Sequence, residues 1–320
     1  MFNNYYIRID FKKNSKFPYY VKNVVRLFIP SFFYERKRDV YLQTKGDKKL
    51  QERVDYYNQL NDTFTLDKEA KSIKHFFGEE KSTYFFDLYR YLRYFPKSFK
   101  ISYLFGDITH VPKQATLVKS RPIEGDNKNA ILMKLNKVRH FIFVKDTLAF
   151  EDKKDLLVWR GKAHMPHRQD FVQRFYNNPY CEIGETKRKR DVTIPWQKPK
   201  MRIVEQLQYK FILSIEGNDV ASNLKWVMSS NSLSFMTKPK YETWFMEGTL
   251  IANHHYVLLK DDYSDLEEKV LYYSSHRDEA LKIIENAHAY VKEFQHKERE
   301  DRLSLLVLQK YFEKSSQVRK

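Results

Sequence analysis

The sequence is poor in glycine. It contains eight glycines in 320 residues, where average usage of about 7% would give roughly 22. Neither G-x-G-x-x-G nor G-x-x-x-x-G-K-[ST] occurs, which argues against a dinucleotide-binding dehydrogenase and against a P-loop NTPase. Any phosphate site must therefore use isolated turns and helix N-termini.

Cysteine and long apolar runs are also lacking. The single cysteine, Cys181, cannot form an internal disulfide and suits a reducing compartment. No apolar run approaches the ~18 residues that suggest a membrane-spanning helix. The first residues, MFNNYYIRIDFKK, lack the apolar core of a secretory signal. We therefore expect a cytoplasmic protein.

Positive charge and aromatic side chains are abundant instead. The chain has 58 Lys and Arg against 41 Asp and Glu, a net charge of +17, and 16% aromatic residues. Such an excess attracts polyanions, which include nucleic acid, an anionic membrane face and phosphorylated glycolipid. Because helix-turn-helix, zinc-finger and RNP signatures are absent, a non-enzymatic nucleic-acid-binding protein is the weaker alternative.

The length of 320 residues suits two cores rather than one. Several short apolar runs predict strands separated by helical patterns, which is typical of βαβ units and a parallel sheet. The predicted strands are 101–107, 139–144, 156–161, 210–215, 232–236 and 255–260, and the predicted helices are 49–60, 82–95, 128–136, 166–176, 202–209, 221–229, 241–248, 264–274 and 277–314. We predict an N-terminal lobe over 1–150, a C-terminal lobe over 151–290 and a helical tail over 291–320.

The segment 16–38 mixes aliphatic, aromatic and basic residues. A helix here would carry Val21, Val24, Val25 and Phe28 on one face and end near Pro30. Two interpretations remain open. The segment rests on an anionic bilayer, or the helix packs on its own domain.

Polar residues at predicted strand ends are the candidate site residues, since ligands of open parallel sheets bind beyond the carboxyl ends of the strands. Asp107 directly follows the run ISYLFG. A carboxylate there can face a cleft as a general base. A turn-forming aspartate is the alternative.

A second strand end carries Arg160 and Gly161, with Arg168 a few residues later. A guanidinium beside a glycine lets side chain and backbone approach a diphosphate together. Pro166 suits the first turn of a helix whose N-terminus favours an anion. A surface salt bridge is the alternative for Arg160.

The third strand end is the turn between 210–215 and the helix expected from Ala221. A tight turn and the free N–H groups of a helix start make an anion site, while an ordinary capped helix is the alternative. In this site a carboxylate at Glu216 can accept hydrogen bonds from a ribose diol. The candidate residues are Glu216, Gly217, Asn218, Asp219, Ser222, Asn223 and Lys225.

Other polar clusters give weaker signals. The pair His164/His167 has no third ligand at metal-site spacing, and the adjacent His254 and His255 at the start of a predicted strand point to opposite faces. The acidic residues Asp261, Asp262 and Asp265 suit a helix cap better than a metal site.

Three stretches resemble one known family. YKFILSIEGNDVASNLKWVMSSNSLSFMTKPKYETWFMEGTLIANHHYVLLKDDYSDLEE (209–268) closely resembles the lipopolysaccharide-core branch of glycosyltransferase family 90. WRGKAHMPHR (159–168) is similar to the Arg-Gly motif of that family, and GDITHVP (106–112) to its segment with the catalytic aspartate.

The resemblance implies a GT-B-like α/β fold of two Rossmann-like lobes facing a cleft, with C-terminal helices. It also implies an inverting hexosyltransferase that uses a UDP-sugar, without an essential metal or other cofactor. The expected acceptor is the anionic lipopolysaccharide inner core, with a capsule or protein acceptor as the alternative.

The same resemblance assigns residue roles. Asp107 matches the catalytic base, Arg160, Gly161 and Arg168 match the donor-side motif, and Gly217, Ser222, Asn223 and Lys225 match the diphosphate loop. Animal members carry an arginine where Asn223 stands, so its individual role is left open. Peripheral contact with the inner membrane is also left open, and no nucleic-acid partner is expected.

Overall fold

The computed structural model describes residues 17–42 and 47–318. Contacts divide the chain into two compact units that are each discontinuous in sequence. The sheet unit contains residues 142–239 and 249–293, and the helical unit contains the described parts of 13–141, 240–248 and 294–320. The sequence prediction of consecutive lobes over 1–150 and 151–290 with a separate tail over 291–320 differs from this division, because the last helix packs within the helical unit.

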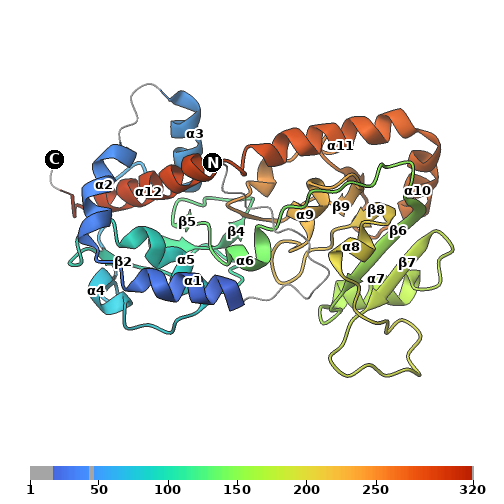
Figure 1. The fold of residues 1–320 in the computed structure, drawn as a ribbon, viewed down its shortest axis with the longest axis horizontal. Coiled ribbons are helices and arrows are strands. Elements are labelled where there is room, and N and C mark those ends of the chain that lie inside the picture. The colour runs from blue at the N-terminus through green and yellow to red at the C-terminus, as the bar shows by residue number, and fades with distance from the viewer. Residues whose placement is uncertain (1–16, 43–46, 319–320) are drawn as a thin grey trace. The chain divides into compact units, whose positions relative to one another are not determined.

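Five parallel strands form the centre of the sheet unit (Figure 1). They are β6 (Lys154–Gly161), β7 (Cys181–Glu185), β8 (Tyr209–Leu213), β9 (Leu233–Thr237) and β11 (Val257–Leu259). Their order across the sheet is β11-β9-β8-β6-β7. The first of these strands along the chain, β6, thus lies between the second, β7, and the third, β8. The direction in which the sheet is built reverses between β6 and β8, as in doubly wound α/β folds.

Helices cover both faces of this sheet because alternate side chains of each strand point to opposite faces. Trp159 and Phe211 pack in one core with α7 (Pro166–Phe175), α10 (Leu266–Ser275) and the start of α11 (Arg277–Lys292). Val158 and Ile212, one residue away in each strand, pack in a second core with α9 (Leu224–Met228) and beside α8 (Ile203–Gln206).

The predicted parallel sheet of the C-terminal half is therefore confirmed. The strands expected at 156–161, 210–215, 232–236 and 255–260, and the helices at 166–176, 221–229 and 264–274, each correspond to a strand or helix of the structure. The helix expected over 202–209 is limited to α8, because β8 already begins at Tyr209.

The helical unit has no comparable sheet among its described residues. Its helices are α1 (Phe17–Leu27), α2 (Phe32–Leu42), α3 (Lys48–Tyr57), α4 (Ile73–Phe76), α5 (Thr83–Leu92), α6 (Lys137–His140) and α12 (Lys297–Lys314). Its strands pair two by two: β1 (Lys71–Ser72) with β2 (Lys100–Ile101), β3 (Thr116–Val118) with β5 (Ala130–Leu132), and β4 (Ser120–Pro122) with β10 (Tyr241–Thr243). The expectation of a second Rossmann-like lobe thus finds no large sheet in this part of the described chain. Among the described helices, none combines the length and apolar character needed to cross a membrane.

A buried carboxylate explains why the last helix belongs to this unit. Glu300 of α12 is 2% exposed and accepts from Lys134 at 2.9 Å and from the indole nitrogen of Trp244 at 2.7 Å. It also pairs with Arg53 of α3 at 2.8 Å. Segments far apart in sequence therefore meet at one side chain, which no local pattern could predict.

Several local predictions for the helical unit are confirmed. Ser82 caps α5, its Oγ accepting from the N–H of Phe85 at 3.2 Å, and α3 corresponds to the helix expected over 49–60. The helical stretch 277–314 is present as two helices, α11 and α12, the second of which continues the helical unit.

Four other predictions need correction. Residues 128–136 contain β5 instead of a helix, and 139–144 begin within α6 instead of forming a strand. The strand expected over 101–107 is reduced to β2 and a bridge from Tyr103 to Leu117. Residues 241–248 form β10 and the start of a 3-10 helix, η1 (Glu247–Thr249).

The error at 241–248 has a tertiary cause. Tyr241–Thr243 pairs with β4, and the buried carboxylate of Glu242 meets the Nε of buried Arg121 at 2.8 Å. A buried ion pair of this geometry requires the strand register. It therefore overrides the helical spacing of the apolar residues around Trp244.

Candidate functional site

The candidate donor site lies where the build direction of the sheet reverses. The loop after β6 covers 162–165 and leads into α7, and the loop after β8 covers 214–223 and leads into α9. In doubly wound folds, ligands bind beyond the carboxyl ends of the two strands that flank this point. The structure therefore brings the second and third sequence-predicted groups to adjacent strand ends.

Arg168 connects these two loops. From the first turn of α7, its Nε donates to the carbonyl oxygen of Glu216 at 2.9 Å, and its Nη2 donates to that of Ile215 at 2.5 Å. Its Nη1 donates to the carbonyl oxygen of Lys162 at 3.1 Å. One guanidinium thus fixes the backbone of both loops, a task that needs the planar donor fork of arginine.

Gly217 allows this close approach of the arginine. A Cβ at position 217 would lie 3.3 Å from Nη2 of Arg168, which is closer than most contacts that Cβ atoms make in proteins. The glycine therefore leaves room for the guanidinium under the turn. The backbone N–H of Gly217 donates to the carbonyl oxygen of Asp219 at 3.0 Å, which closes the turn.

Arg160 is engaged inside the sheet unit. Its guanidinium pairs with the carboxylate of Glu182 and donates to the carbonyl oxygen of Glu182 at 2.9 Å. Burial raises the pKa of Glu182, but hydrogen bonds from Arg160 and Lys198 outweigh burial and hold the pKa below its ordinary value of 4.5. The side chain of Arg160 is only 6% exposed, so Arg160 orders the end of β6.

Glu182 was not predicted as a site residue. It lies 22 positions from Arg160 in the sequence, and the two residues meet because β6 and β7 pair in parallel. The only sequence signal near Glu182 is the short apolar stretch that forms β7. This stretch predicts a strand but does not reveal that the strand pairs with β6.

The predicted diphosphate loop contains both exposed and buried members. Asn218 is exposed, and Glu216, Gly217, Ser222 and Asn223 are partly buried. The amide nitrogen of Asn223 donates to the carbonyl oxygen of Leu213 at 2.9 Å and thus fixes the start of α9 to the end of β8.

Two predicted members of this loop are buried. Asp219 is 2% exposed and Lys225 is 0% exposed. A cation in direct contact with a diphosphate needs an accessible position. Lys225, the second residue of α9, is not accessible in this structure, so its match to the diphosphate loop stays a prediction.

Two histidines contact the loop after β8, at the switch point, which is the place between β6 and β8 where the build direction of the sheet reverses. Nε2 of His167 lies 2.9 Å from the carbonyl oxygen of Glu216, and Nε2 of His164 lies 3.4 Å from Oδ1 of Asn218. Both histidines and Lys162 are exposed. Their spacing in the sequence suggested a metal pair without a third ligand, and the structure gives them loop partners instead.

Asp107 belongs to the helical unit. Its carboxylate pairs with the ammonium of Lys119, whose side chain is 1% exposed, while the side chain of Asp107 is 20% exposed. Next to it, the Oγ of Ser120 accepts from the N–H of Ile108 at 3.1 Å and donates to the carbonyl oxygen of Ile108 at 3.0 Å. The carboxylate is therefore held in one orientation and still reaches the surface.

The acidic residues after β11 order the turn before α10, and the expected helix cap is only partly met: Asp265 is the N-cap residue of α10, but its side chain makes no capping hydrogen bond. Oδ1 of Asp265 accepts from the N–H of Lys260 at 3.0 Å, and Oδ1 of Asp262 accepts from the N–H of Ser264 at 3.0 Å. Within the described chain, no three His, Cys, Asp or Glu side chains gather as metal ligands.

Comparison with known proteins identifies the family of the chain. The family described as Glycosyl transferase family 90 matches residues 130–315. The chain is also 46% identical over 263 residues to the O-glucosyltransferase LpsA of Dichelobacter nodosus, and the match covers 82% of each protein.

Proposed function

Because the chain belongs to glycosyltransferase family 90, we propose that it transfers glucose from UDP-glucose to a hydroxyl group of the lipopolysaccharide inner core, with inversion at the anomeric carbon. A similar protein carries the name O-glucosyltransferase, which favours glucose over galactose as the sugar. The net charge of +17 suits a phosphorylated acceptor.

The observation that carries the donor site is the link between the two loops at the switch point. Arg168 bonds the carbonyl oxygens of Ile215 and Glu216 from one loop and of Lys162 from the other. A nucleotide that binds at this place would meet a backbone that is already ordered. Preorganisation of this kind lowers the entropic cost of binding.

The two arginines act in this proposal as positioning residues. Arg160 and Arg168 both direct their guanidinium groups to protein oxygens. An exposed cation beside them is Lys162, which lies next to Gly161 at the end of β6. We assign contact with the diphosphate to Lys162 and to the loop backbone, and contact with the ribose diol to Glu216.

The acceptor side needs a base. The acceptor oxygen forms a bond to the anomeric carbon while the bond from that carbon to the diphosphate breaks, and the hydroxyl proton moves to a carboxylate. We assign this carboxylate to Asp107, whose side chain is oriented by Lys119 and reaches the surface. The departing UDP takes the negative charge, which cations and N–H groups stabilise.

We further propose that the transfer needs no divalent metal. The support is chemical, since Lys162 and oriented backbone N–H groups supply positive charge to a leaving diphosphate. Transfer measured with and without a chelator tests this part separately. Loss of activity on chelation that Mg²⁺ or Mn²⁺ restores would contradict it.

Incubation of the purified protein with nucleotide sugars and a truncated core acceptor tests the function. We expect transfer from UDP-glucose, with little from UDP-galactose and none from GDP-mannose. Capsule oligosaccharide and a folded protein domain serve as competing acceptors, because a related transferase with the same donor site would prefer one of these. Absence of transfer from every nucleotide sugar would reject the proposal.

A further inference from the structure

Helix α1 has an inverted amphipathic pattern. Its only fully buried residue is the polar Asn23, at 8% exposure, while Val25 is 59% and Phe28 is 82% exposed. A surface helix normally turns its apolar stripe to the core and its polar face to water. Here the apolar stripe faces outward.

Specific contacts hold α1 in this orientation. The hydroxyl of Tyr19 donates to Oδ1 of Asp87 at 2.9 Å, and the amide of Asn23 donates to the carbonyl oxygen of Tyr19 at 2.8 Å. Buried Arg93 donates to the carbonyl oxygens of Arg26 and Ile29 at the end of the helix. The outward position of the valines therefore follows from buried polar bonds of the inner face.

Helix α2 repeats the pattern. Tyr34 and Tyr41 point inward and make edge contacts with Tyr94 at 5.1 Å and 6.0 Å between ring centroids. Phe32 and Phe33 are 51% and 57% exposed. Both helices thus use tyrosines for internal packing and leave valine and phenylalanine outside.

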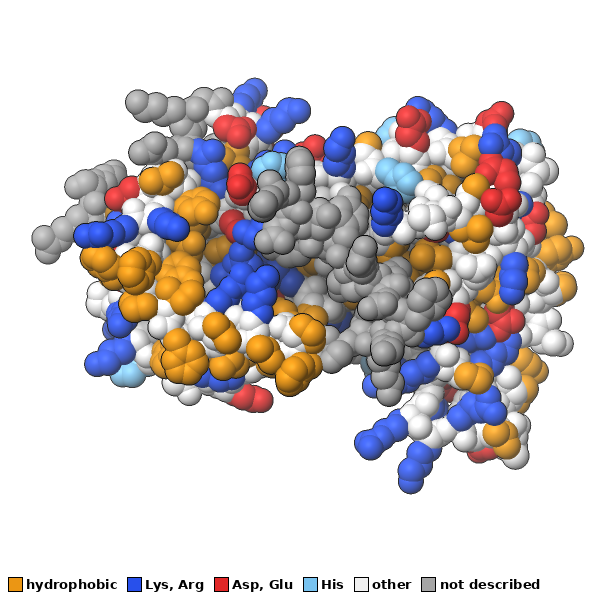
Figure 2. All heavy atoms as spheres, viewed as in Figure 1, with side chains coloured by type: hydrophobic (Ala, Val, Ile, Leu, Met, Phe, Trp, Pro, Cys, Tyr) orange, Lys and Arg blue, Asp and Glu red, His pale blue; other side chains and the backbone are white. Residues whose placement is uncertain are grey.

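Most of the exposed apolar side chains of the described chain lie on these two helices and the turn between them. Of the fifteen large hydrophobic side chains that are exposed in the described chain, nine lie between residues 17 and 40. Exposed apolar patches of this kind mark interaction sites. We call this surface the α1–α2 face and define it by Phe17, Val21, Val25, Phe28, Phe32 and Phe33. Figure 2 shows hydrophobic side chains gathered along α1, with Lys and Arg side chains beside them.

The charge around the face is positive. Helices α1 and α2 and the turn between them contain five Lys or Arg against two Asp or Glu. A pocket of about 180 Å³ beside α1 is lined by Arg26, Arg90, Arg93 and Lys297, with Asp301 as its acidic residue. Arg90 and Lys297 both pair with that one carboxylate, at 2.9 Å and 2.6 Å. The pocket therefore has an excess of positive charge and suits an anionic group.

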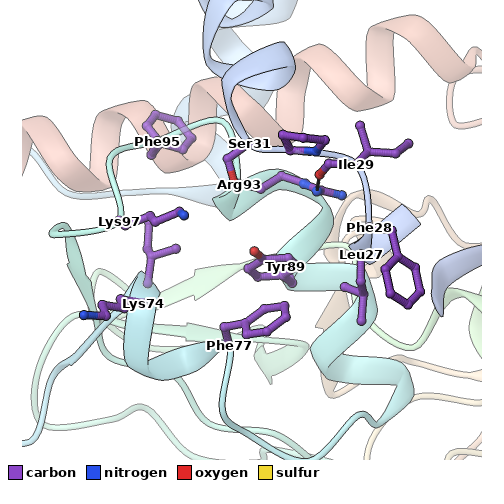
Figure 3. Close-up of a pocket in the computed structure, with 12 residues that line it drawn as sticks. Leu27, Phe28, Ile29, Ser31, Lys74, Phe77, Tyr89, Arg93, Phe95 and Lys97 are labelled. Atoms are coloured by element: carbon purple, nitrogen blue, oxygen red, sulfur yellow. Dashed lines mark hydrogen bonds between the residues drawn. The ribbon is translucent and has the colours of Figure 1, made fainter. Parts of the chain in front are cut away.

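A second pocket extends the apolar surface (Figure 3). It has a volume of about 240 Å³ and lies beside the turn between α1 and α2, with Phe28 on one side and Tyr89 and Phe77 below. Lys74 and Lys97 line it as well. An apolar floor with a basic rim is the chemistry that an anionic amphiphile requires.

We propose that the α1–α2 face docks the protein on a bilayer that contains anionic lipids. The apolar side chains enter the boundary between headgroups and acyl chains, as in interfacial amphipathic helices. The cations beside them meet lipid phosphates. This surface lies outside the residues assigned to transfer, so the docking and the reaction are separable by experiment.

Co-sedimentation with vesicles tests the proposal. The purified full-length chain is mixed with vesicles of phosphatidylglycerol and phosphatidylcholine, or of phosphatidylcholine alone. We expect binding to the anionic vesicles, and a loss of about a hundredfold in the triple variant Phe17→Ser/Val25→Ser/Phe28→Ser. Lys22→Gln with Lys37→Gln should weaken binding to the anionic vesicles by about 25-fold, at roughly fivefold per cation.

The matched control is Val192→Ser/Ile251→Ser/Leu271→Ser, three substitutions at exposed apolar residues of the sheet unit. It should bind vesicles like the wild type, and both triple variants should keep wild-type transfer to a short soluble acceptor. Equal vesicle binding by the two triple variants would overturn the proposal. A wild-type dimer that the α1–α2 variant converts to a monomer, with no vesicle binding, would show that a second copy covers the face instead.

Discussion

Nε of Arg168 donates to the carbonyl oxygen of Glu216 at 2.9 Å, across the point where the sheet reverses its build direction. Glu216 lies 48 positions later in the chain. Together with the bond to the carbonyl oxygen of Lys162, this bond shows that the arginine orders the backbone of both loops at the candidate donor site. Arg168 therefore has a specific physical role beyond its match to the family motif.

Arg168→Ala should lower the affinity for UDP by about tenfold or more, because the two loops lose their common link. The loss of three charged hydrogen bonds should also lower the free energy of unfolding by about 2–4 kcal/mol. Calorimetric titration with UDP and urea unfolding measure the two effects. Arg174→Ala, on the same helix and exposed, is the control and should change neither value. Unchanged UDP affinity in Arg168→Ala would remove the link from the donor site.

Asp107→Asn should abolish transfer and leave UDP affinity unchanged, because only the proton acceptor is lost. Since buried Lys119 then faces a neutral amide, the free energy of unfolding should fall by about 2 kcal/mol. Transfer assays below the unfolding temperature separate the two effects. Asp126→Asn, an exposed residue of the same unit, should behave like the wild type. Near-normal turnover in Asp107→Asn would exclude Asp107 as the base.

His255 should make the stability depend on acid pH. Burial, together with the neighbouring His254, lowers the pKa of His255 from 6.5 to about 4, and its Nδ1 accepts from the N–H of Ile251 at 3.0 Å. As the pH falls, the unfolded chain therefore binds a proton at this histidine before the folded chain does. The contribution of the neutral ring to the free energy of unfolding is complete above pH 6.5 and is lost as the pH falls through about 4.

The corresponding test compares melting temperatures at pH 7 and pH 4.5. His255→Asn keeps a hydrogen-bond acceptor but does not titrate, so the decrease in melting temperature should be smaller than in the wild type. His110→Asn, at an exposed position, should show the decrease of the wild type. Identical decreases in all three proteins would assign the acid sensitivity to other groups.

Glu300→Ala should be among the most destabilising single changes. It leaves the cations of Arg53 and Lys134 buried without their common carboxylate, which typically costs about 3–5 kcal/mol. Urea unfolding should show this loss, and Glu298→Ala on the exposed side of α12 should stay within about 0.5 kcal/mol of the wild type. A small effect in Glu300→Ala would mean that the helical unit is held chiefly by its apolar contacts.

The sequence by itself determined those features that depend on neighbours along the chain. The short apolar runs predicted the strands β6, β8, β9 and β11, and the hydroxyl of Ser82 predicted the start of α5. The rule that ligands bind at strand ends then selected Arg160 and Glu216 as candidate site residues before any coordinates. These inferences succeed because caps and periodicity act over a few residues.

Only the tertiary structure decided which partner each polar group takes. Arg160 meets Glu182, Lys225 is buried, residues 241–248 form a strand because Glu242 meets Arg121, and α1 turns its valines outward because Tyr19 bonds Asp87. Each outcome depends on contacts between residues that are distant in sequence. The free energy of these contacts exceeds the preference of the local sequence for another conformation or orientation. Periodicity defines the faces of a helix, but the buried hydrogen bonds of its neighbours decide which face turns inward.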